Sequence, residues 1–264
     1  MNRLETEMCE MLRKGRETFG WLAVKAEFEA EGTRLDELLR LVEIARRADL
    51  QVAVKIGGCE ALMDLFQAKQ IGADYVVGPM IETAYALTKY AAAVNKAYAE
   101  DELSDTDFLW NVETTTGFSN LDQMLDVAAK NKCLAGIVFG RSDYCGSLAL
   151  HSDDVNSSRV ITDIQATATK CKTENLDLVV GGGVSIDSLD GLRAVRSIHL
   201  TRFETRKIVM SSSALDISVI NDGMLAALQF ELKWLTNKRN YYNVIYREDE
   251  KRFNTLKSRW GLAD

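Results

Sequence analysis

Two acidic residues, Glu113 in WNVETTTG and Asp143 in GIVFGRSDYCG, each follow an apolar run and precede a segment with helical spacing. In a βα barrel, the carboxyl ends of the strands carry the catalytic groups. Two carboxylates on that face, with water and substrate oxygens completing an octahedron, are what Mg²⁺ requires of a protein. Strand-end acids also cap helices and form salt bridges. The polar, glycine-containing surroundings of both residues favour the first interpretation, so the sequence predicts a divalent metal site.

Apolar, strand-like runs alternate with helix-like segments along the chain. After an opening helix to about Gly15, strands are expected at 21–28, 52–56, 74–78, 107–112, 136–140, 177–180, 198–203 and 207–211. Amphipathic segments follow most of them, and the last covers 215–238. About eight such units predict one α/β domain over residues 1–264, a (β/α)8 TIM barrel with an N-terminal helix and a long C-terminal helical segment. A doubly wound open sheet is the alternative.

The charge balance argues against a nucleic-acid surface. The 264 residues include 39 acidic and 32 basic ones, a formal charge of −7, and the basic residues form no stripe. The five cysteines lack a C-x-x-C pair, which indicates reduced thiols and a cytoplasmic location. No window approaches the ~20 apolar residues of a membrane span, and the charged N-terminus is unlike a signal peptide. We expect neither nucleic acid nor membrane as a partner.

Five segments in order, within residues 20–150, resemble the HpcH/HpaI aldolase and citrate lyase β-subunit superfamily: AEFEAEG, VAVKIGG, GADYVVGPMIETA, NVETTTGFSNLDQM and GIVFGRSDYCGSLAL. The resemblance implies a magnesium-dependent barrel that makes or breaks carbon–carbon bonds beside a 2-oxo acid or a thioester. It implies that Glu113 and Asp143 hold Mg²⁺ (or Mn²⁺), which stabilises an enolate without a lysine Schiff base. It also implies a homo-oligomer, a trimer or hexamer, whose subunits complete one another's sites.

Two positions depart from the family pattern. Lys55 in VAVKIGG stands where an arginine usually contacts a substrate oxygen, and lysine offers a compact point charge instead of a planar fork. The alternative for Lys55 is a side chain that only covers the barrel end. Ala30 stands where pyruvate-type aldolases have a histidine general base. The general base is then a metal-bound water or one of the first-strand acids, Glu27, Glu29 or Glu31.

The same resemblance suggests further site residues. Backbone groups at Gly140, Arg141, Ser142 and Asp143 are expected to seat the substrate's carboxylate. Glu82 in PMIETA either helps organise the site, as in relatives, or stabilises the dipole of the helix that follows it.

Two later features each have two interpretations. The glycines 181–183 either bring backbone N–H groups to a phosphate or carboxylate, or make a tight turn between a strand and a helix. The charged residues of segment 202–207 either bind phosphate, as late barrel loops often do, or form a solvated loop.

These features predict a metal-dependent carbon–carbon lyase of the aldolase/citrate lyase type. Its substrate is expected to be a small anion, a 2-oxo acid or carboxylated compound, with a phosphorylated or CoA-linked form as an option. One alternative is enolpyruvate chemistry of the phosphoenolpyruvate mutase type, and another is a non-catalytic barrel that acts as a binding or assembly partner. The aromatic segment 230–253 forms an interface or lid, or packs on its own barrel.

Overall fold

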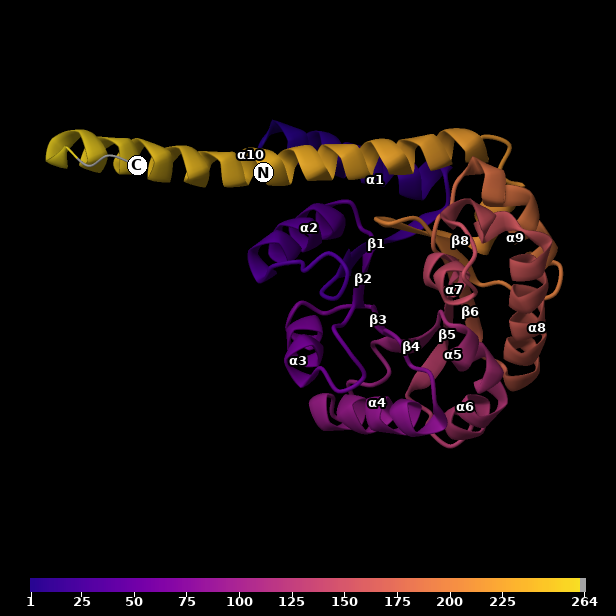
Figure 1. Cartoon of the computed structure of the whole chain (residues 1–264). Coiled ribbons are helices and arrows are strands. Elements are labelled where there is room, and N and C mark those ends of the chain that lie inside the picture. Colours follow the sequence, from indigo (N-terminus) through magenta and orange to yellow (C-terminus); the bar gives the residue numbers. More distant parts are fainter. Residues whose placement is uncertain (262–264) are drawn as a thin grey trace.

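Eight strands close into a barrel in the computed structural model, which describes residues 1–261 (Figure 1). Strands that follow one another in the chain are neighbours in the barrel. They are β1 (Trp21–Glu27), β2 (Gln51–Lys55), β3 (Tyr75–Gly78), β4 (Asp107–Val112), β5 (Leu134–Gly140), β6 (Asp177–Gly181), β7 (Arg202–Glu204) and β8 (Ile208–Ser211). The predicted barrel is confirmed, and the open-sheet alternative is wrong.

Helices surround this barrel because their apolar residues recur at helical spacing and face the sheet. In the second helix, for example, Leu38, Leu41 and Ile44 are buried. The helices are α1 (Arg3–Thr18), α2 (Leu35–Arg47), α3 (Leu62–Gln70), α4 (Ala84–Ala97), α5 (Thr115–Ser119), α6 (Leu121–Ala128), α7 (Arg141–Ser147), α8 (Ser158–Glu174), α9 (Leu189–Arg196) and α10 (Ile220–Trp260). Short 3₁₀ segments are η1 (Ser152–Asn156), η2 (Ile186–Ser188) and η3 (Ser212–Asp216).

The core has two layers, because successive residues of a strand point to opposite faces. The larger layer fills the space between the strands and the helices. The smaller layer fills the inside of the barrel and consists of Ala23, Ala53, Tyr75, Val77, Leu109, Val138, Val179 and Val209. Polar side chains at the carboxyl ends of the strands therefore lie above an apolar plug. We call this end of the barrel the mouth.

The last strand departs from eight repeated strand–helix units. β8 runs antiparallel to both β7 and β1, whereas the other neighbouring pairs are parallel. A tight connection joins β7 to β8, and the amide of Thr205 donates a hydrogen bond to the Ile208 carbonyl across it. Because β7 ends at the mouth, this hairpin turns there. It brings Glu204, Thr205 and Arg206 to the same hollow as the other strand ends.

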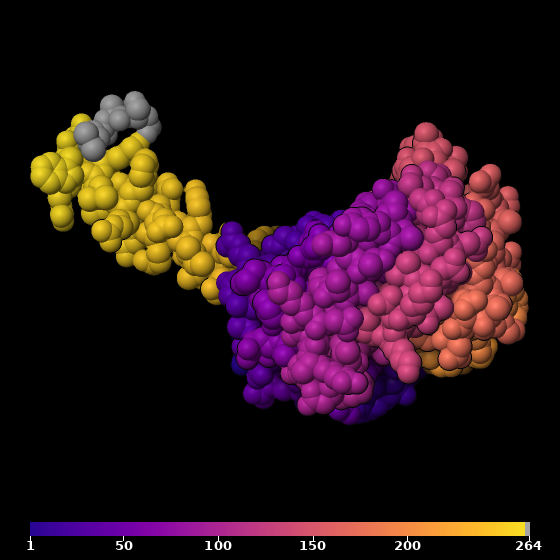
Figure 2. Space-filling view, turned by 90° about the horizontal axis from the view of Figure 1, so that it is seen from below, coloured from indigo at the N-terminus to yellow at the C-terminus, as the bar shows by residue number. Residues whose placement is uncertain are grey.

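The final helix is much longer than the predicted segment 215–238. α10 begins at Ile220 and continues for 41 residues to Trp260, where Gly261 ends it in the left-handed conformation. Its first half lies along α1, and its second half projects from the barrel as a free-standing arm (Figures 1 and 2). Within residues 1–261, no helix is long and apolar enough to cross a membrane.

Candidate active site

A cavity of about 340 Å³ opens at the mouth. Most of the predicted site residues line it. They come from β1, β2, the end of β5, the start of α7 and the loops after β1 and β4. The predicted residues in the lining are Glu27, Glu29, Lys55, Glu113, Gly140, Ser142 and Asp143. The structure therefore brings together side chains that are up to 116 positions apart in the sequence, from Glu27 to Asp143.

Glu113 is the more buried of the two predicted metal ligands, with 2% of its surface exposed. Its Oε1 accepts a hydrogen bond of 2.9 Å from the amide of Met80. Its Oε2 accepts hydrogen bonds from the side-chain amide of Asn111 and, at 3.2 Å, from Lys55 Nζ. Gly140 leaves room for this carboxylate, because a Cβ there would lie 2.8 Å from Glu113 Oε2. The orientation of Glu113 is thus fixed from three sides.

Asp143 lies in the first turn of α7 at the exposed rim of the same cavity. Partial burial of its carboxyl group and the negative charge of Glu113 raise the pKa of Asp143 above its ordinary value. Both causes disfavour the ionised form of Asp143. A cation bound beside Asp143 would favour its ionised form.

Lys55 lies between two carboxylates of the cavity. Its Nζ is 3.1 Å from Glu29 Oε2 and 3.2 Å from Glu113 Oε2. Burial by itself would lower the pKa of Lys55, but the charges of Glu113 and Glu29 outweigh it and raise the pKa above the ordinary value. Lys55 is therefore a permanently charged ammonium group that faces the cavity, not a side chain that only covers the barrel end.

Sequence reasoning missed a second charged group in the cavity, centred on Lys25. This lysine ends inside the barrel, hydrogen-bonded to Glu204 and 3.0 Å from Glu27 Oε1. Arg206, from the hairpin, is 2.9 Å from Glu27 Oε2. Although burial opposes ionisation, the charges of Lys25 and Arg206 hold the pKa of Glu27 below its ordinary value. Glu27 is therefore a poor proton acceptor. The sequence could have predicted the place of Lys25, because the alternation of side chains along β1 points this residue into the barrel.

The charged segment 202–207 divides between the two ends of the barrel. Arg202 lies at the end opposite the mouth, where it pairs with Asp177 at 2.6 Å and stacks on Tyr75. Glu204 and Lys207 are buried, with 5% and 2% of their surfaces exposed, and Lys207 pairs with Glu31. A solvated loop therefore does not describe this segment.

Two predicted site residues lie outside the cavity. Glu82 accepts a hydrogen bond of 2.6 Å from the Thr114 hydroxyl and so braces the loop after β4. Arg141 is fully buried, and its guanidinium donates to the carbonyls of Gly181 and Gly182 and to Asn156. Burial lowers the pKa of Arg141 to about 10, so its side chain stays charged at neutral pH and fixes the loop after β6.

The residues at the mouth fit a divalent ion. Within residues 1–261, no three His, Cys, Asp or Glu side chains already converge as a complete ion cage. However, Mg²⁺ usually takes one or two carboxylates and completes its shell with water and substrate. Asn111 Oδ1 is buried in the lining and accepts no hydrogen bond from any residue in 1–261. The lining also has five acidic and three basic side chains, an excess of two negative charges: Glu27, Glu29, Glu113, Asp143, Glu204, Lys25, Lys55 and Arg206.

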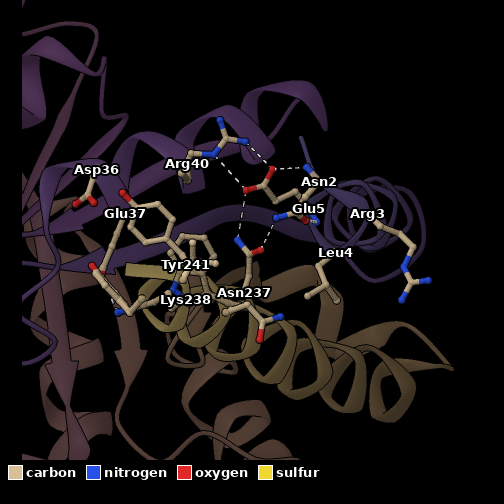
Figure 3. A pocket seen from close by; sticks show the side chains of 14 residues that line it. Asn2, Arg3, Leu4, Glu5, Asp36, Glu37, Arg40, Asn237, Lys238 and Tyr241 are labelled. Atoms are coloured by element: carbon tan, nitrogen blue, oxygen red, sulfur yellow. Dashed lines mark hydrogen bonds and ion pairs between the residues drawn. The ribbon is translucent and has the colours of Figure 1, made fainter. Parts of the chain in front are cut away.

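A larger hollow of about 600 Å³ lies on the outside of the barrel, where α1 and α2 meet the middle of α10 (Figure 3). Its polar groups are bonded to one another: Glu5 accepts hydrogen bonds from Arg40 and from the amide of Asn2, and Asn2 donates to Asn237. Such mutually satisfied groups hold the three helices together. They leave the mouth as the place for chemistry.

A closed barrel with carboxylates and a lysine at the carboxyl ends of its strands has the architecture of a barrel enzyme. The chain belongs to the HpcH/HpaI aldolase/citrate lyase family, whose model matches residues 29–195. This family consists of lyase- and aldolase-like enzymes, and the chain is a lyase of this superfamily. The matched range includes Glu29, Lys55, Glu113 and Asp143 and ends before the β7–β8 hairpin.

Several solved structures share the fold of this chain. An HpcH/HpaI aldolase from Desulfitobacterium hafniense DCB-2 has a TM-score of 0.59 at 12% identity, over 79% of this chain and 84% of its own. A family protein from Burkholderia cenocepacia J2315 has a TM-score of 0.58 at 13% identity, over 91% and 90%. The citrate synthase SbnG has a TM-score of 0.56 at 13% identity, over 75% and 81%. A comparison with curated proteins finds no match.

Proposed function

We propose that this protein is a metal-dependent carbon–carbon lyase that acts on a small 2-oxo acid or carboxylated substrate through an enolate. The observation that carries the proposal is that Glu113 and Asp143 line one cavity, which also presents Lys55 and the unpartnered oxygen of Asn111. Mg²⁺ or Mn²⁺ prefers this all-oxygen donor set.

The ion-binding role falls to three residues. Glu113 and Asp143 would hold the ion, and Asn111 Oδ1 would contact it directly or through water. A divalent ion at this position supplies Lewis-acid stabilisation of an enolate oxygen. Lys55 Nζ, which now neutralises Glu113 and Glu29, would instead donate to the substrate's carboxylate or carbonyl oxygen.

The first-strand acids divide their roles according to their partners. Both oxygens of Glu27 are engaged by Lys25 and Arg206, so its role is to position these cations. Glu29 is half-buried in the lining, and within residues 1–261 its ion-pair partner is Lys55. In the cleavage direction, Glu29 takes the proton of the hydroxyl beside the breaking bond. That carbon becomes a carbonyl, and the electron pair of the broken bond stays with the carboxylate-bearing fragment, which later regains a proton.

Arg206 supports an anionic substrate. Its side chain is 49% exposed at the rim of the cavity, where it can meet a second carboxylate, a phosphate or the phosphates of a CoA thioester. The family also supports an assembly of several copies, proposed here as a trimer or hexamer. A cytoplasmic location is supported by five cysteines without a disulfide.

Calorimetric titration of Mg²⁺ and Mn²⁺, with and without oxalate as a planar enolate mimic, tests the proposal. In the wild type, oxalate binding should depend on the metal. Asp143→Asn should weaken metal-dependent oxalate binding about tenfold or more, because a charged ligand becomes neutral. The matched control Asp153→Asn, at a position 90% exposed and outside the cavity, should bind like the wild type.

The outcomes separate the three candidate functions. A wild type that binds no metal contradicts the lyase mechanism and leaves the non-catalytic barrel. Metal-dependent oxalate binding with release of pyruvate from a 2-oxo acid substrate supports the lyase. Rearrangement of an enolpyruvate compound without release of pyruvate supports the mutase-type alternative.

A further inference from the structure

The exposed face of α10 carries apolar residues in a regular seven-residue pattern. Its buried face includes Gly223, Ala227, Phe230 and Trp234, which pack on the barrel and α1. On the opposite side, residues at alternating spacings of three and four form a line that we call the heptad stripe. It comprises Leu225, Leu228, Leu232, Leu235, Arg239, Tyr242, Tyr246, Asp249, Phe253, Leu256 and Trp260. All are exposed except Tyr242, which is half-buried because its hydroxyl donates to Glu37 of α2 and Arg34 lies over its ring.

This stripe has the composition of a coiled-coil seam, because nine of its eleven positions are leucine or aromatic. Leu225, Leu228, Leu232 and Leu235 are 49–57% exposed, and Trp260 is 72% exposed. A monomer gains nothing from presenting large apolar side chains to water along one side of a helix. The stripe therefore requires a partner, and a helix with the same repeat is the partner it fits.

The two charged members of the stripe identify that partner as a second copy in antiparallel orientation. Arg239 and Asp249 are exposed, and neither forms an ion pair with any residue in the described range 1–261. In a parallel pair, Arg239 would face the partner's Arg239, and Asp249 would face the partner's Asp249. In an antiparallel pair centred at residue 244, Arg239 faces the partner's Asp249. By symmetry, Asp249 also faces the partner's Arg239.

The same register aligns the rest of the stripe. Tyr242 meets the partner's Tyr246, Leu235 meets the partner's Phe253, and Leu232 meets the partner's Leu256. Leu228 meets the partner's Trp260. A shift by one heptad would place both charges opposite apolar side chains, so only this antiparallel register pairs them. In this register, the positions on either side of the stripe would form one contact between opposite charges and one between like charges. These contacts therefore do not favour one register over another.

We propose that α10 pairs with α10 of a second copy as an antiparallel coiled coil with its two-fold axis near Val244. The paired region extends from residue 228 to 260, about 50 Å of helix. The arm stands clear of its own barrel, so the partner's helix has access to it (Figure 2). A strict seven-residue repeat would wind the two helices into a left-handed supercoil.

This pairing brings the partner close to the mouth. Leu225 and Leu228 line a small cavity of about 280 Å³ together with Gly183, Thr205 and Arg206, which also line the mouth. Because Leu228 meets the partner's Trp260, the end of the partner's arm would form the outer wall of this cavity. The inference stands on α10 alone and does not depend on the proposed reaction.

Charge reversal in the full-length protein tests both the partner and its orientation. Sedimentation equilibrium should show the wild type as a dimer or as a larger assembly with two-fold axes, such as a hexamer. Arg239→Asp alone and Asp249→Arg alone should each raise the dissociation constant of this contact about tenfold or more, because each places like charges face to face. The double variant should restore wild-type association.

Any other pattern overturns the proposal. Single reversals that associate as well as the wild type would indicate a parallel pair or no role for the stripe. A wild type that is monomeric or a ring trimer without two-fold axes would also contradict it. Circular dichroism should show that all four proteins fold, since both side chains are exposed.

Cysteine cross-linking gives an independent measurement of the register. Mixing a Leu232→Cys chain with a Leu256→Cys chain should give a disulfide-linked heterodimer, because facing positions of a seam lie within disulfide range. Neither chain should cross-link to itself. Wild type serves as the background control, since Cys59 and Cys133 are only half-buried. Self-linking of Leu232→Cys would establish a parallel pair and overturn the proposal.

Discussion

Lys25 shows how single residues set the electrostatics of the mouth. Its ammonium group is buried, and burial alone would lower its pKa, but the charges of Glu204 and then Glu27 raise the pKa well above its ordinary value. A lysine held in this way stays charged and neutralises acids that would otherwise be buried ions. Lys25 therefore contributes first to the stability of the fold and second to the charge of the cavity.

Lys25→Met should therefore destabilise the protein by about 3–5 kcal/mol, because it leaves Glu204 and Glu27 without their buried counter-ion. Urea denaturation followed by circular dichroism measures the loss. The double variant Lys25→Met/Glu204→Leu should recover a large part of it, since both charges of the close pair are then gone. A single variant as stable as the wild type would show that the pair contributes no net stability.

The same scale shows how the side chains of one predicted motif diverge in the structure. Gly140 to Asp143 form one continuous motif in the sequence, but α7 begins at Arg141, and on a helix of 3.6 residues per turn the side chains of Arg141 and Asp143 lie about 200° apart around the axis. Asp143 reaches the cavity, whereas Arg141 points beneath the loop after β6. The spacing in the sequence places such a motif at the mouth. Which of its side chains points into the cavity depends on where the helix begins.

At the scale of elements, the loop after β6 determines how closely two strand ends approach. Gly182 has a φ of +78°, and a Cβ there would lie 2.5 Å from the amide nitrogen of Ser142 and 2.7 Å from that of Arg141. The glycine is thus needed for both its conformation and its size. It packs directly against the turn that carries Asp143.

Gly182→Ala should destabilise the protein by about 1–3 kcal/mol and should also weaken metal-dependent oxalate binding, because the α7 turn must move. The matched control is Gly146→Ala in α7, where the added Cβ meets nothing within 4 Å and the backbone is helical. That variant should be unchanged or slightly more stable. Thermal unfolding and oxalate titration of both variants check the contrast, and equal behaviour of the two would contradict it.

Element prediction from the sequence worked where periodicity was strong and failed where a connection was unusual. Alternation of apolar strands and amphipathic helices was sufficient for β1 to β6, whose faces are both buried. The hairpin between β7 and β8 was missed because a three-residue turn replaces the expected crossover. The end of α10 was missed because its outer half packs on little of its own barrel and because Val244 and Ile245, which lie outside the heptad stripe, weaken the apolar periodicity.

At the scale of the whole molecule, the two ends of the chain are held together at one point. Glu5 of α1 accepts hydrogen bonds from Arg40 of α2 and from Asn237 of α10 (Figure 3). Burial would raise the pKa of Glu5, but the hydrogen bonds from Arg40, Asn2 and Asn237 outweigh it and lower the pKa. We call this group of hydrogen bonds around Glu5 the clasp. It sets the direction in which α10 leaves the barrel, and hence the direction of its free-standing half.

The clasp makes stability depend on pH in a defined direction. A carboxyl group whose pKa is lower in the folded than in the unfolded chain stabilises the fold fully above its ordinary value of 4.5. This contribution is lost as the pH falls through the lower, folded value. Glu5→Gln should therefore cost about 1–3 kcal/mol near neutral pH, because the buried partners lose their charged acceptor.

The difference in melting temperature between wild type and Glu5→Gln should shrink as the solution becomes more acidic than the ordinary glutamate pKa. Glu10→Gln, at an exposed position of the same helix, should follow the wild type at every pH. A gap for Glu5→Gln that stays constant into strong acid would show that the ionised carboxylate is not what joins α1, α2 and α10. The orientation of the arm would then depend on the apolar contacts of Phe230 and Trp234 alone.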